Sequence, residues 1–305
     1  MTRRGWLFFL AMAVIWGIPY LLIRVAVRQL DPGVLVFLRT APAAALLWPL
    51  VIARRHVPAV LAHWRWIVIF GVVEFGVPWY FMASAERHLT SSLTSLLICC
   101  VPLLSILGQR LRPGREPVSR RRYAGLLTGA VGVALLVGFN VTSGSLVWMG
   151  AMLVVCVGYT VGPAILSSKL ASVPGLAIVA GATTVVALAW LPWSVARWPE
   201  RVNAETWSSV AVLSVVCTAG AFLCFHELVK EAGPSRATVV TYVNTALAVV
   251  LGVAILNEPL TTGIVLGFPF VLVGSVLATS APRAASLRVG SADEGHRDPR
   301  LTSHE

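Results

Sequence analysis

The chain has 305 residues, of which 57% are hydrophobic and only 12% are charged, and its formal net charge is +11. A soluble domain typically carries about 25% charged residues, so this composition excludes an ordinary water-soluble protein. Apolar runs of roughly 18–23 residues follow one another, and each is long enough to cross about 30 Å of hydrocarbon as a helix. The sequence therefore predicts an all-α protein that crosses a membrane many times.

Ten apolar segments can be delimited in chain order, because charged residues and the turn formers Gly, Pro, Asn and Ser separate them. The predicted segments are 6–27, 33–53, 65–85, 92–110, 122–139, 145–167, 175–196, 207–229, 236–256 and 262–280. Arg3 and Arg4 precede the first segment, which continues past any small-residue cleavage site. It is therefore predicted to be a signal anchor that is not removed. The polar tail, 281–305, is predicted to be a disordered cytoplasmic segment.

Lysine and arginine are distributed unevenly between the two sides of the predicted bundle. Of the 24 Lys and Arg residues, eighteen fall on the side of the N-terminus, four fall on the other side, and Arg24 and Arg39 lie within spans. Basic residues accumulate in cytoplasmic loops. The distribution therefore predicts a multi-pass protein of the plasma membrane with both termini cytoplasmic. It also accounts for the basic excess without a nucleic-acid partner.

Two stretches of the chain resemble each other: EPVSRRRYAGLLTGAVGVAL at 116–135 and EPLTTGIVLGFPFVLVGSVL at 258–277. They share six of twenty positions, including the Glu-Pro pair and two glycines at the same spacing. Five predicted helices separate the copies, so the second copy enters the membrane in the opposite direction. Only the first copy carries three arginines, as expected for a cytoplasmic loop. The sequence predicts ten transmembrane helices in two inverted five-helix repeats, 1–140 and 141–280, a plan that recurs in secondary transporters.

Six stretches, taken in order, resemble the EamA-type branch of the drug/metabolite transporter (DMT) superfamily. They are AVIWGIPYLLIRVAV at 13–27, FLRTAPAAALL at 37–47, AERHLTSSLTSLL at 85–97, REPVSRRRYAGLLTGAVGVALL at 115–136, AGPSRATVVTYVN at 232–244 and NEPLTTGIVLGFPFVLVGSVL at 257–277. The resemblance covers nearly the whole of 6–280. It implies ten helices in two halves, a central cavity, and export or exchange of small metabolites or drugs.

The chain departs from that family's pattern in two places. The Gly-Glu pair that often precedes the last helix of each half is Arg115-Glu116 and Asn257-Glu258 in this sequence. A proline that is common in the ninth helix is replaced around Asn244, which becomes a candidate substrate-contacting residue. Both departures leave the substrate open.

Glu74 is an acidic residue near the middle of the third predicted span. A charge at the centre of a bilayer costs roughly 2.5–3.5 kcal/mol or more, so the side chain is expected to face a cavity or a partner. Burial would favour a neutral carboxyl group, which suits proton coupling or cation binding. The alternative is a protonated glutamate that hydrogen-bonds to a neighbouring helix and only fixes the packing.

Arg39 lies about two turns into the second predicted span. One interpretation is a structural role, in which the side chain extends to the interface or forms a fixed pair. The other is an anchor for an anionic group of the substrate, or a counter-ion for Glu74. Arg24, three residues from the end of its segment, is predicted to extend to the membrane surface.

Several aromatic residues lie well inside the predicted spans. Gly17 and Pro19 weaken the helix between two of them, which transporters tolerate beside a cavity. The candidates for lining a pocket are Trp16, Tyr20, Trp79, Tyr159 and Tyr242. The alternative is ordinary core packing or an aromatic belt at the membrane interface.

Glycines recur at spacings of four and seven residues in the fifth and tenth segments. Such spacings place small residues on one helix face, where they let two helices approach closely. The predicted packing residues are Gly125, Gly129, Gly132, Gly267 and Gly274.

The sequence favours a secondary active transporter that acts as an exporter or exchanger, with proton coupling as an option. No phosphate-binding G-x-x-x-x-G-K loop, H-E-x-x-H or G-x-S-x-G motif occurs, and every aspartate lies outside the spans. An enzyme, a cofactor and a metal site are therefore not predicted. The expected partners are a small-molecule substrate and the lipid bilayer, with monomer or homodimer left open. The alternative function is a non-transporting membrane sensor or scaffold.

Overall fold

The computed structural model describes residues 2–110, 120–139, 144–232 and 240–279. In its first part the chain forms the elements α1 (Arg3–Gly17), α2 (Pro19–Ala26), α3 (Pro32–Ala53), α4 (Val57–Ala62), α5 (Trp64–Gly71), η1 (Val72–Gly76), α6 (Val77–Ala85), α7 (Ser91–Ile98), α8 (Val101–Arg110) and α9 (Arg120–Gly138). The second part forms α10 (Ser145–Lys169), α11 (Gly175–Ala196), α12 (Ala204–Ser214), η2 (Val215–Gly220), α13 (Ala221–Ala232), α15 (Val240–Leu256) and α16 (Thr262–Thr279). The predicted tail 281–305 and Glu116 lie outside the described residues.

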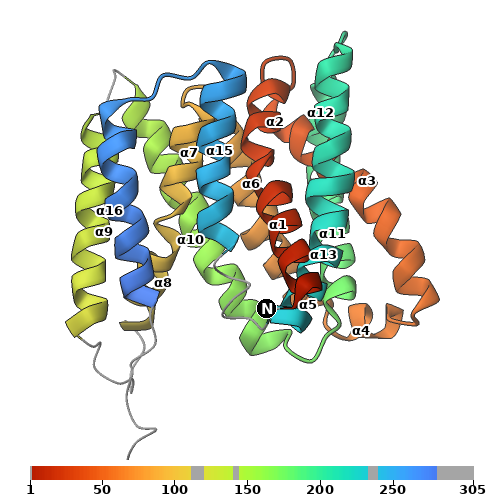
Figure 1. The fold of residues 1–305 in the computed structure, drawn as a ribbon. Coiled ribbons are helices and arrows are strands. Elements are labelled where there is room, and N and C mark those ends of the chain that lie inside the picture. The colour runs from red at the N-terminus through yellow and green to blue at the C-terminus, as the bar shows by residue number, and fades with distance from the viewer. Residues whose placement is uncertain (1, 111–119, 140–143, 233–239, 280–305) are drawn as a thin grey trace, which may run out of the picture.

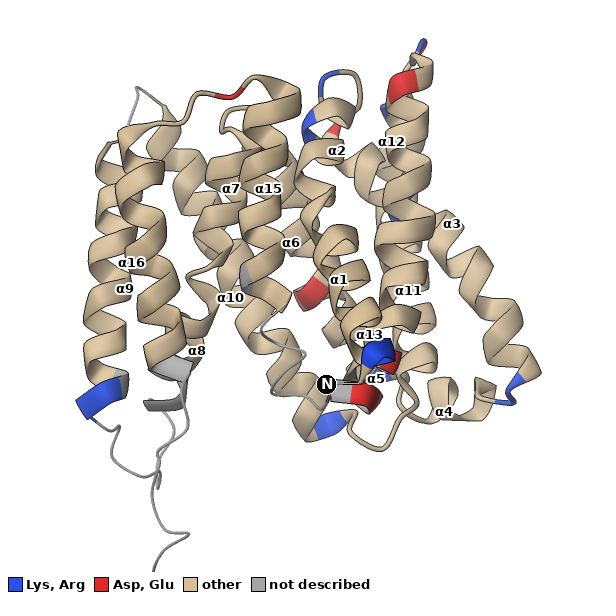
Figure 2. Ribbon diagram, in the orientation of Figure 1, with Lys and Arg blue, Asp and Glu red and all other residues tan. Residues whose placement is uncertain are grey.

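Six helical stretches are long and apolar enough to cross a membrane: Arg3–Ala26, Pro32–Ala53, Trp64–Ala85, Ser145–Lys169, Gly175–Ala196 and Ala204–Phe225. Four shorter apolar helices occupy the other predicted segments: Ser91–Ser105, Tyr123–Gly138, Val243–Leu256 and Thr262–Leu277. Charged residues gather at the two ends of the helices, and the middle of the bundle is nearly free of them (Figure 2). The all-helical, multi-pass prediction is therefore confirmed, with six spans established by length and composition.

The helices run back and forth between two ends of one bundle. The chain starts at one end, called here the Arg3 end, and α2 reaches the opposite end, called here the Asp31 end (Figure 1). Helices from the two parts of the chain then pack against each other: α9 along α16, α3 along α11, α6 against α10, and α2 against α12. α15 packs against both α1 and α7. The two parts are therefore interleaved and share one core.

The pair α9 and α16 forms one edge of the bundle through very close backbone contact (Figure 1). A Cβ atom on Gly132 would lie 2.5 Å from the backbone nitrogen of Val271. A Cβ atom on Gly274 would lie 2.5 Å from the Cα of Gly129. The two helices can approach this closely because glycine has no side chain. All five predicted packing glycines lie on these two helices: Gly125, Gly129, Gly132, Gly267 and Gly274.

Two long helices contain a short π-helical segment that the sequence analysis did not predict. η1 lies between α5 and α6, and η2 lies between α12 and α13. A π-turn widens the helix, disturbs its regular hydrogen-bond ladder, and is frequent at functional sites. The third span of the first part and the third span of the second part thus carry the same irregularity at mid-length.

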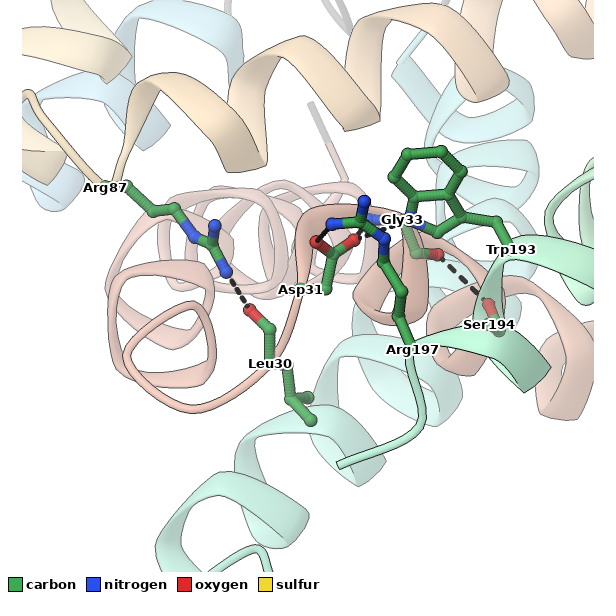
Figure 3. Close-up of polar contacts among 7 residues, drawn as sticks. All are labelled: Leu30, Asp31, Gly33, Arg87, Trp193, Ser194 and Arg197. Carbon is green, nitrogen blue, oxygen red and sulfur yellow. Dashed lines mark hydrogen bonds and ion pairs between the residues drawn. The ribbon is translucent and has the colours of Figure 1, made fainter. Parts of the chain in front are cut away.

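Polar contacts join the two parts of the chain at the Asp31 end (Figure 3). Asp31 caps the start of α3, accepts a hydrogen bond of 2.8 Å from Trp193 Nε1, and lies 3.7 Å from Arg197. Arg87 donates a hydrogen bond of 2.8 Å to the carbonyl oxygen of Leu30. The contacts of Asp31 with Trp193 and Arg197 hold the start of α3 against the end of α11.

Candidate functional site

Arg39 is a buried guanidinium at the place where α3, α6 and η2 meet. Its side chain is only 6% exposed, although it carries a permanent charge. Its guanidinium carbon lies 3.6 Å from the centre of the Trp79 ring. Its Nε donates a hydrogen bond of 3.1 Å to Thr218 Oγ1. Both parts of the chain therefore contribute to the surroundings of this cation.

Thr218 reaches Arg39 because of the π-helical segment η2. The Thr218 hydroxyl donates a hydrogen bond of 2.8 Å to the carbonyl oxygen of Leu213, five residues earlier. It thereby satisfies a carbonyl at the point where the regular α-helical ladder is broken. The oxygen of the same hydroxyl is then oriented to accept from Arg39. Thr218 was not among the predicted site residues, because a threonine in an apolar span gives no distinctive signal.

The rest of the Arg39 guanidinium has no partner among the described residues. Its hydrogen bond to Thr218 uses one donor, and no described carboxylate forms an ion pair with it. Glu74, the counter-ion considered in the sequence analysis, is oriented elsewhere. Its Cδ would lie 2.9 Å from a Cβ atom on Gly162 of α10, and its buried Oε2 has no described hydrogen-bond partner.

Aromatic rings surround the Arg39 guanidinium. Trp79 packs against Phe75 with ring centres 4.8 Å apart, and Phe75 packs in turn against Phe222 of α13 at 5.7 Å. Tyr20 and Tyr159 are close enough to interact electrostatically with the guanidinium. Of the predicted site residues, the structure thus brings Arg39, Trp79, Tyr20 and Tyr159 together. We call these four residues and Thr218 the Arg39 cluster.

The other predicted site residues have different surroundings. Trp16 stacks on Phe225 with ring centres 4.9 Å apart, in a separate apolar cluster between α1 and α13. Asn244 is 5% exposed, and its Oδ1 accepts a hydrogen bond from the neighbouring Thr245 at 3.3 Å. Tyr242 lies on α15, but its side chain is outside the described part of the structure.

Glu258 is a buried carboxylate whose role was not predicted. It accepts hydrogen bonds from the backbone nitrogens of Ser91 and Ser92 at 2.7 and 3.0 Å, and from the Ser92 hydroxyl at 2.6 Å. The first N–H groups of a helix have no partner within the helix, so this carboxylate caps the start of α7. The repeated Glu-Pro pair was the sequence signal that could have indicated it.

Glu86 is a second buried carboxylate, directly after the end of α6. It is 0% exposed, and neither of its carboxylate oxygens has a hydrogen-bond partner among the described residues. Arg24 donates a hydrogen bond to the backbone carbonyl of Glu86, directly after the end of α6. Burial raises the pKa of Glu86 well above its ordinary value. The sequence analysis assigned Glu86 to a turn, where burial has no local signature.

This architecture, a bundle of apolar helices from two interleaved parts with a buried cation between them, defines a polytopic membrane protein of the transporter class. The sequence profile of the EamA-like transporter family matches residues 3–138 and again residues 146–280. The chain therefore belongs to the EamA-like transporter family. Membership indicates a transporter rather than an enzyme.

Relatives with the same overall length support this assignment. An uncharacterized transporter of Archaeoglobus fulgidus is 23% identical over 279 residues, which cover 89% of this chain and 97% of the relative. The uncharacterized inner membrane transporter YedA of Escherichia coli K12 is 24% identical over 260 residues, or 82% of each chain. A solved crystal structure superposes with a TM-score of 0.65 at 21% identity, covering 92% of this chain and 98% of the other, and supports the fold.

Proposed function

We propose that this protein is a secondary active transporter that exports or exchanges a small anionic metabolite, which binds at the Arg39 guanidinium. The observation that carries the proposal is the buried guanidinium itself. It stacks on Trp79 and donates to Thr218, and no carboxylate among the described residues lies within ion-pair distance of it. An arginine cannot be deprotonated in a protein, so its charge must be compensated.

The unused N–H donors of the guanidinium favour a bound anion over a purely structural role. A charge inside a membrane protein costs roughly 2.5–3.5 kcal/mol or more. The stacking on Trp79 contributes about 2 kcal/mol when desolvated, and one charged hydrogen bond contributes about 1.5–3 kcal/mol. These two contacts offset the cost but leave four of the five N–H donors without a described partner. A planar carboxylate or phosphate group would accept two of them side by side.

The surroundings of the guanidinium indicate the rest of the solute. Trp79, Phe75 and Phe222 present ring faces and edges, whereas Tyr20 and Tyr159 add hydroxyl groups. Ligand sites in proteins are mostly apolar, with a few polar groups that fix orientation. The proposed solute therefore carries an anionic group beside an apolar or aromatic part.

The arrangement of the helices supports two inverted five-helix repeats, 1–140 and 141–280, as part of the proposal. Exchanging a helix for its counterpart in the other part of the chain preserves the packing: the contact of α6 with α10 becomes the contact of α13 with α1. The segments η1 and η2 are likewise counterparts. A site between two inverted repeats lies near the middle of the membrane and can be opened to either side in turn.

We also propose how the protein is oriented in the membrane and which residues couple transport to a proton. The excess of basic residues on the Arg3 side favours cytoplasmic termini, including the tail 281–305, in the plasma membrane. Two acidic side chains, the partly buried Glu74 and the fully buried Glu86, are the candidates for binding a coupled proton. Trp16, Asn244 and Tyr242 stay proposed contacts for the solute in another state of the transporter.

Solute counterflow in proteoliposomes tests the function. Proteoliposomes that contain the purified protein would be loaded with amino acids, organic acids, nucleosides or cationic drugs in turn. The exchange of the loaded solute for labelled solute outside would then be followed. We expect exchange with an anionic solute, and a loss of about tenfold or more in Arg39→Gln, because a charged hydrogen-bonding group is removed. Arg197→Gln, at an exposed arginine of the Asp31 end, is the matched control and should retain exchange.

Two results would contradict the proposal. Exchange restricted to cationic solutes would exclude the anion site at Arg39. The absence of counterflow for every solute, in protein that is shown to be folded, would favour the alternative function of a membrane sensor or scaffold.

A further inference from the structure

Two buried carboxylates near the Asp31 end have opposite surroundings. Glu258 accepts three hydrogen bonds of 2.6–3.0 Å from the start of α7 and caps that helix. Glu86 is completely buried and accepts none from the described residues. An ionised carboxylate without water or donors is costly. A buried carboxyl group without donors favours its protonated form, so Glu86 is suited to binding a proton.

The charged and titratable groups around Glu86 come from three other elements. Arg24 and Tyr20 belong to α2, Arg39 belongs to α3, and Glu258 lies between α15 and α16. Burial raises the pKa of Glu86, the Arg24 guanidinium lowers it, the Glu258 carboxylate raises it, and the Arg39 guanidinium lowers it.

The neighbours of Glu86 on its own segment have other partners. Arg87 donates a hydrogen bond to the Leu30 carbonyl. His88 stacks on Trp148 with ring centres 4.1 Å apart. These two side chains therefore do not compensate the Glu86 carboxylate.

We propose that Glu86 is a proton-binding site that is linked to the anion site at Arg39, so that the anion and a proton bind together. The inference rests on the proposed function of the Arg39 cluster. The positive charge of Arg39 favours the ionised form of Glu86. An anion bound to the guanidinium cancels much of that charge, so the carboxyl group then binds a proton more tightly. Linkage is reciprocal, and the protonated protein therefore binds the anion more tightly.

The geometry assigns this role to Glu86 rather than to Glu74. The Glu74 carboxylate lies against Gly162 of α10, and Tyr159 is the titratable group among the described residues that interacts with it. Arg39, by contrast, is one of the charged groups that act on Glu86, and both carboxylate oxygens of Glu86 are buried without a described hydrogen-bond partner.

Infrared titration of the purified protein tests the linkage without any solute. Substituting Arg39→Gln removes the same positive charge that a bound anion would cancel. We expect a carboxylic acid band that is absent in Glu86→Gln and retained in Glu74→Gln. In Arg39→Gln the midpoint of that band should move to higher pH, because an opposite charge that favours the ionised carboxylate is lost. Arg197→Gln is the matched control and should leave the midpoint in place.

Three outcomes would overturn the proposal. They are a midpoint that does not move in Arg39→Gln, a band that persists in Glu86→Gln, and a band that never titrates while the protein stays folded. If Glu86→Gln does not fold, Glu86→Asp assigns the band, since the carboxyl group is kept in a shifted position and its band should move.

A transport measurement separates this proposal from the proposed function. In proteoliposomes with an imposed pH gradient, Glu86→Gln should abolish the dependence of anion transport on the gradient, whereas Glu200→Gln, at an exposed acid, should not. Retained pH dependence in Glu86→Gln would refute the proton site while leaving the anion site intact. If the midpoint of the carboxylic acid band moves in Arg39→Gln but no anion is exchanged in proteoliposomes, the proposed function alone is refuted.

Discussion

Three glutamates inside the bundle behave differently because their immediate neighbours differ. Glu258 meets the N–H groups of a helix start, Glu74 meets a glycine of α10, and Glu86 meets no described donor. The same type of side chain therefore caps a helix at position 258, packs against a glycine at position 74, and lies without described donors at position 86. At this scale, the hydrogen-bond donors within reach decide the chemistry.

Glu86→Gln should change how the stability of the protein depends on pH. The pKa of Glu86 is raised in the folded state, so the folded protein keeps a proton that the unfolded chain releases above the ordinary value of 4.5. The stabilisation from this group is complete below that ordinary value and is lost as the pH rises through the raised value. Thermal unfolding in detergent should show a Tm that falls over this window in the wild type and falls less in Glu86→Gln. A Glu86→Gln profile that follows the wild type would contradict the expectation, and Glu200→Gln is the control.

Single elements in this bundle depend on residues supplied by distant parts of the chain. The helix α7 begins with the cap residue Thr90, whose hydroxyl accepts from the backbone nitrogen of Leu93 at 3.1 Å. Two further N–H groups at its start are satisfied by Glu258 from the connection between α15 and α16. Likewise, α9 packs closely against α16 because both helices carry glycines where they touch.

Glu258→Ala should loosen the start of α7. Removing a side chain that caps a helix costs about 0.5–2 kcal/mol. We therefore expect lower thermal stability and faster hydrogen exchange at the Ser91 and Ser92 amides. Glu205→Ala is a matched control, because Glu205 lies exposed in the first turn of α12 and should matter less. Unchanged exchange at the start of α7 would show that water replaces the cap.

Gly274→Ala should weaken the contact between α9 and α16. The added methyl group would meet the backbone of Gly129, which cannot move as a flexible side chain does. Overpacking of this kind costs about 1–3 kcal/mol. Gly150→Ala on α10 is the control, because nothing lies within 4 Å of its Cβ position. Equal unfolding midpoints for the two variants in a denaturant titration would argue against the close contact.

The whole molecule combines two matched parts that share one core. The family profile matches both parts, and partner helices come from opposite parts throughout the bundle. The Arg39 cluster lies where residues of α2, α3, α6, α10 and η2 meet, so neither part could form it alone. Movement of one part against the other would therefore change the site directly.

Cysteine labelling tests the orientation of the molecule. With cytoplasmic termini, a cysteine placed by Arg201→Cys should react with a membrane-impermeant thiol reagent added to intact cells. A cysteine placed by Arg121→Cys should react only after the membrane is opened, because basic loops stay on the cytoplasmic side. The wild type, with its five free cysteines, gives the background. The opposite labelling pattern would reverse the proposed topology.

The sequence by itself determined the helical segments, the membrane environment and the duplication, because segment length, apolar composition and repeated motifs are local properties of the chain. It also singled out Arg39 and Glu74, since a charge inside an apolar run is visible without a structure. Only the tertiary structure decided that Arg39 meets Thr218, 179 residues away, and that Glu86 is fully buried. The physical reason is that the partner of a buried polar group depends on which helix faces meet. Packing between distant segments sets that choice, and no local pattern encodes it.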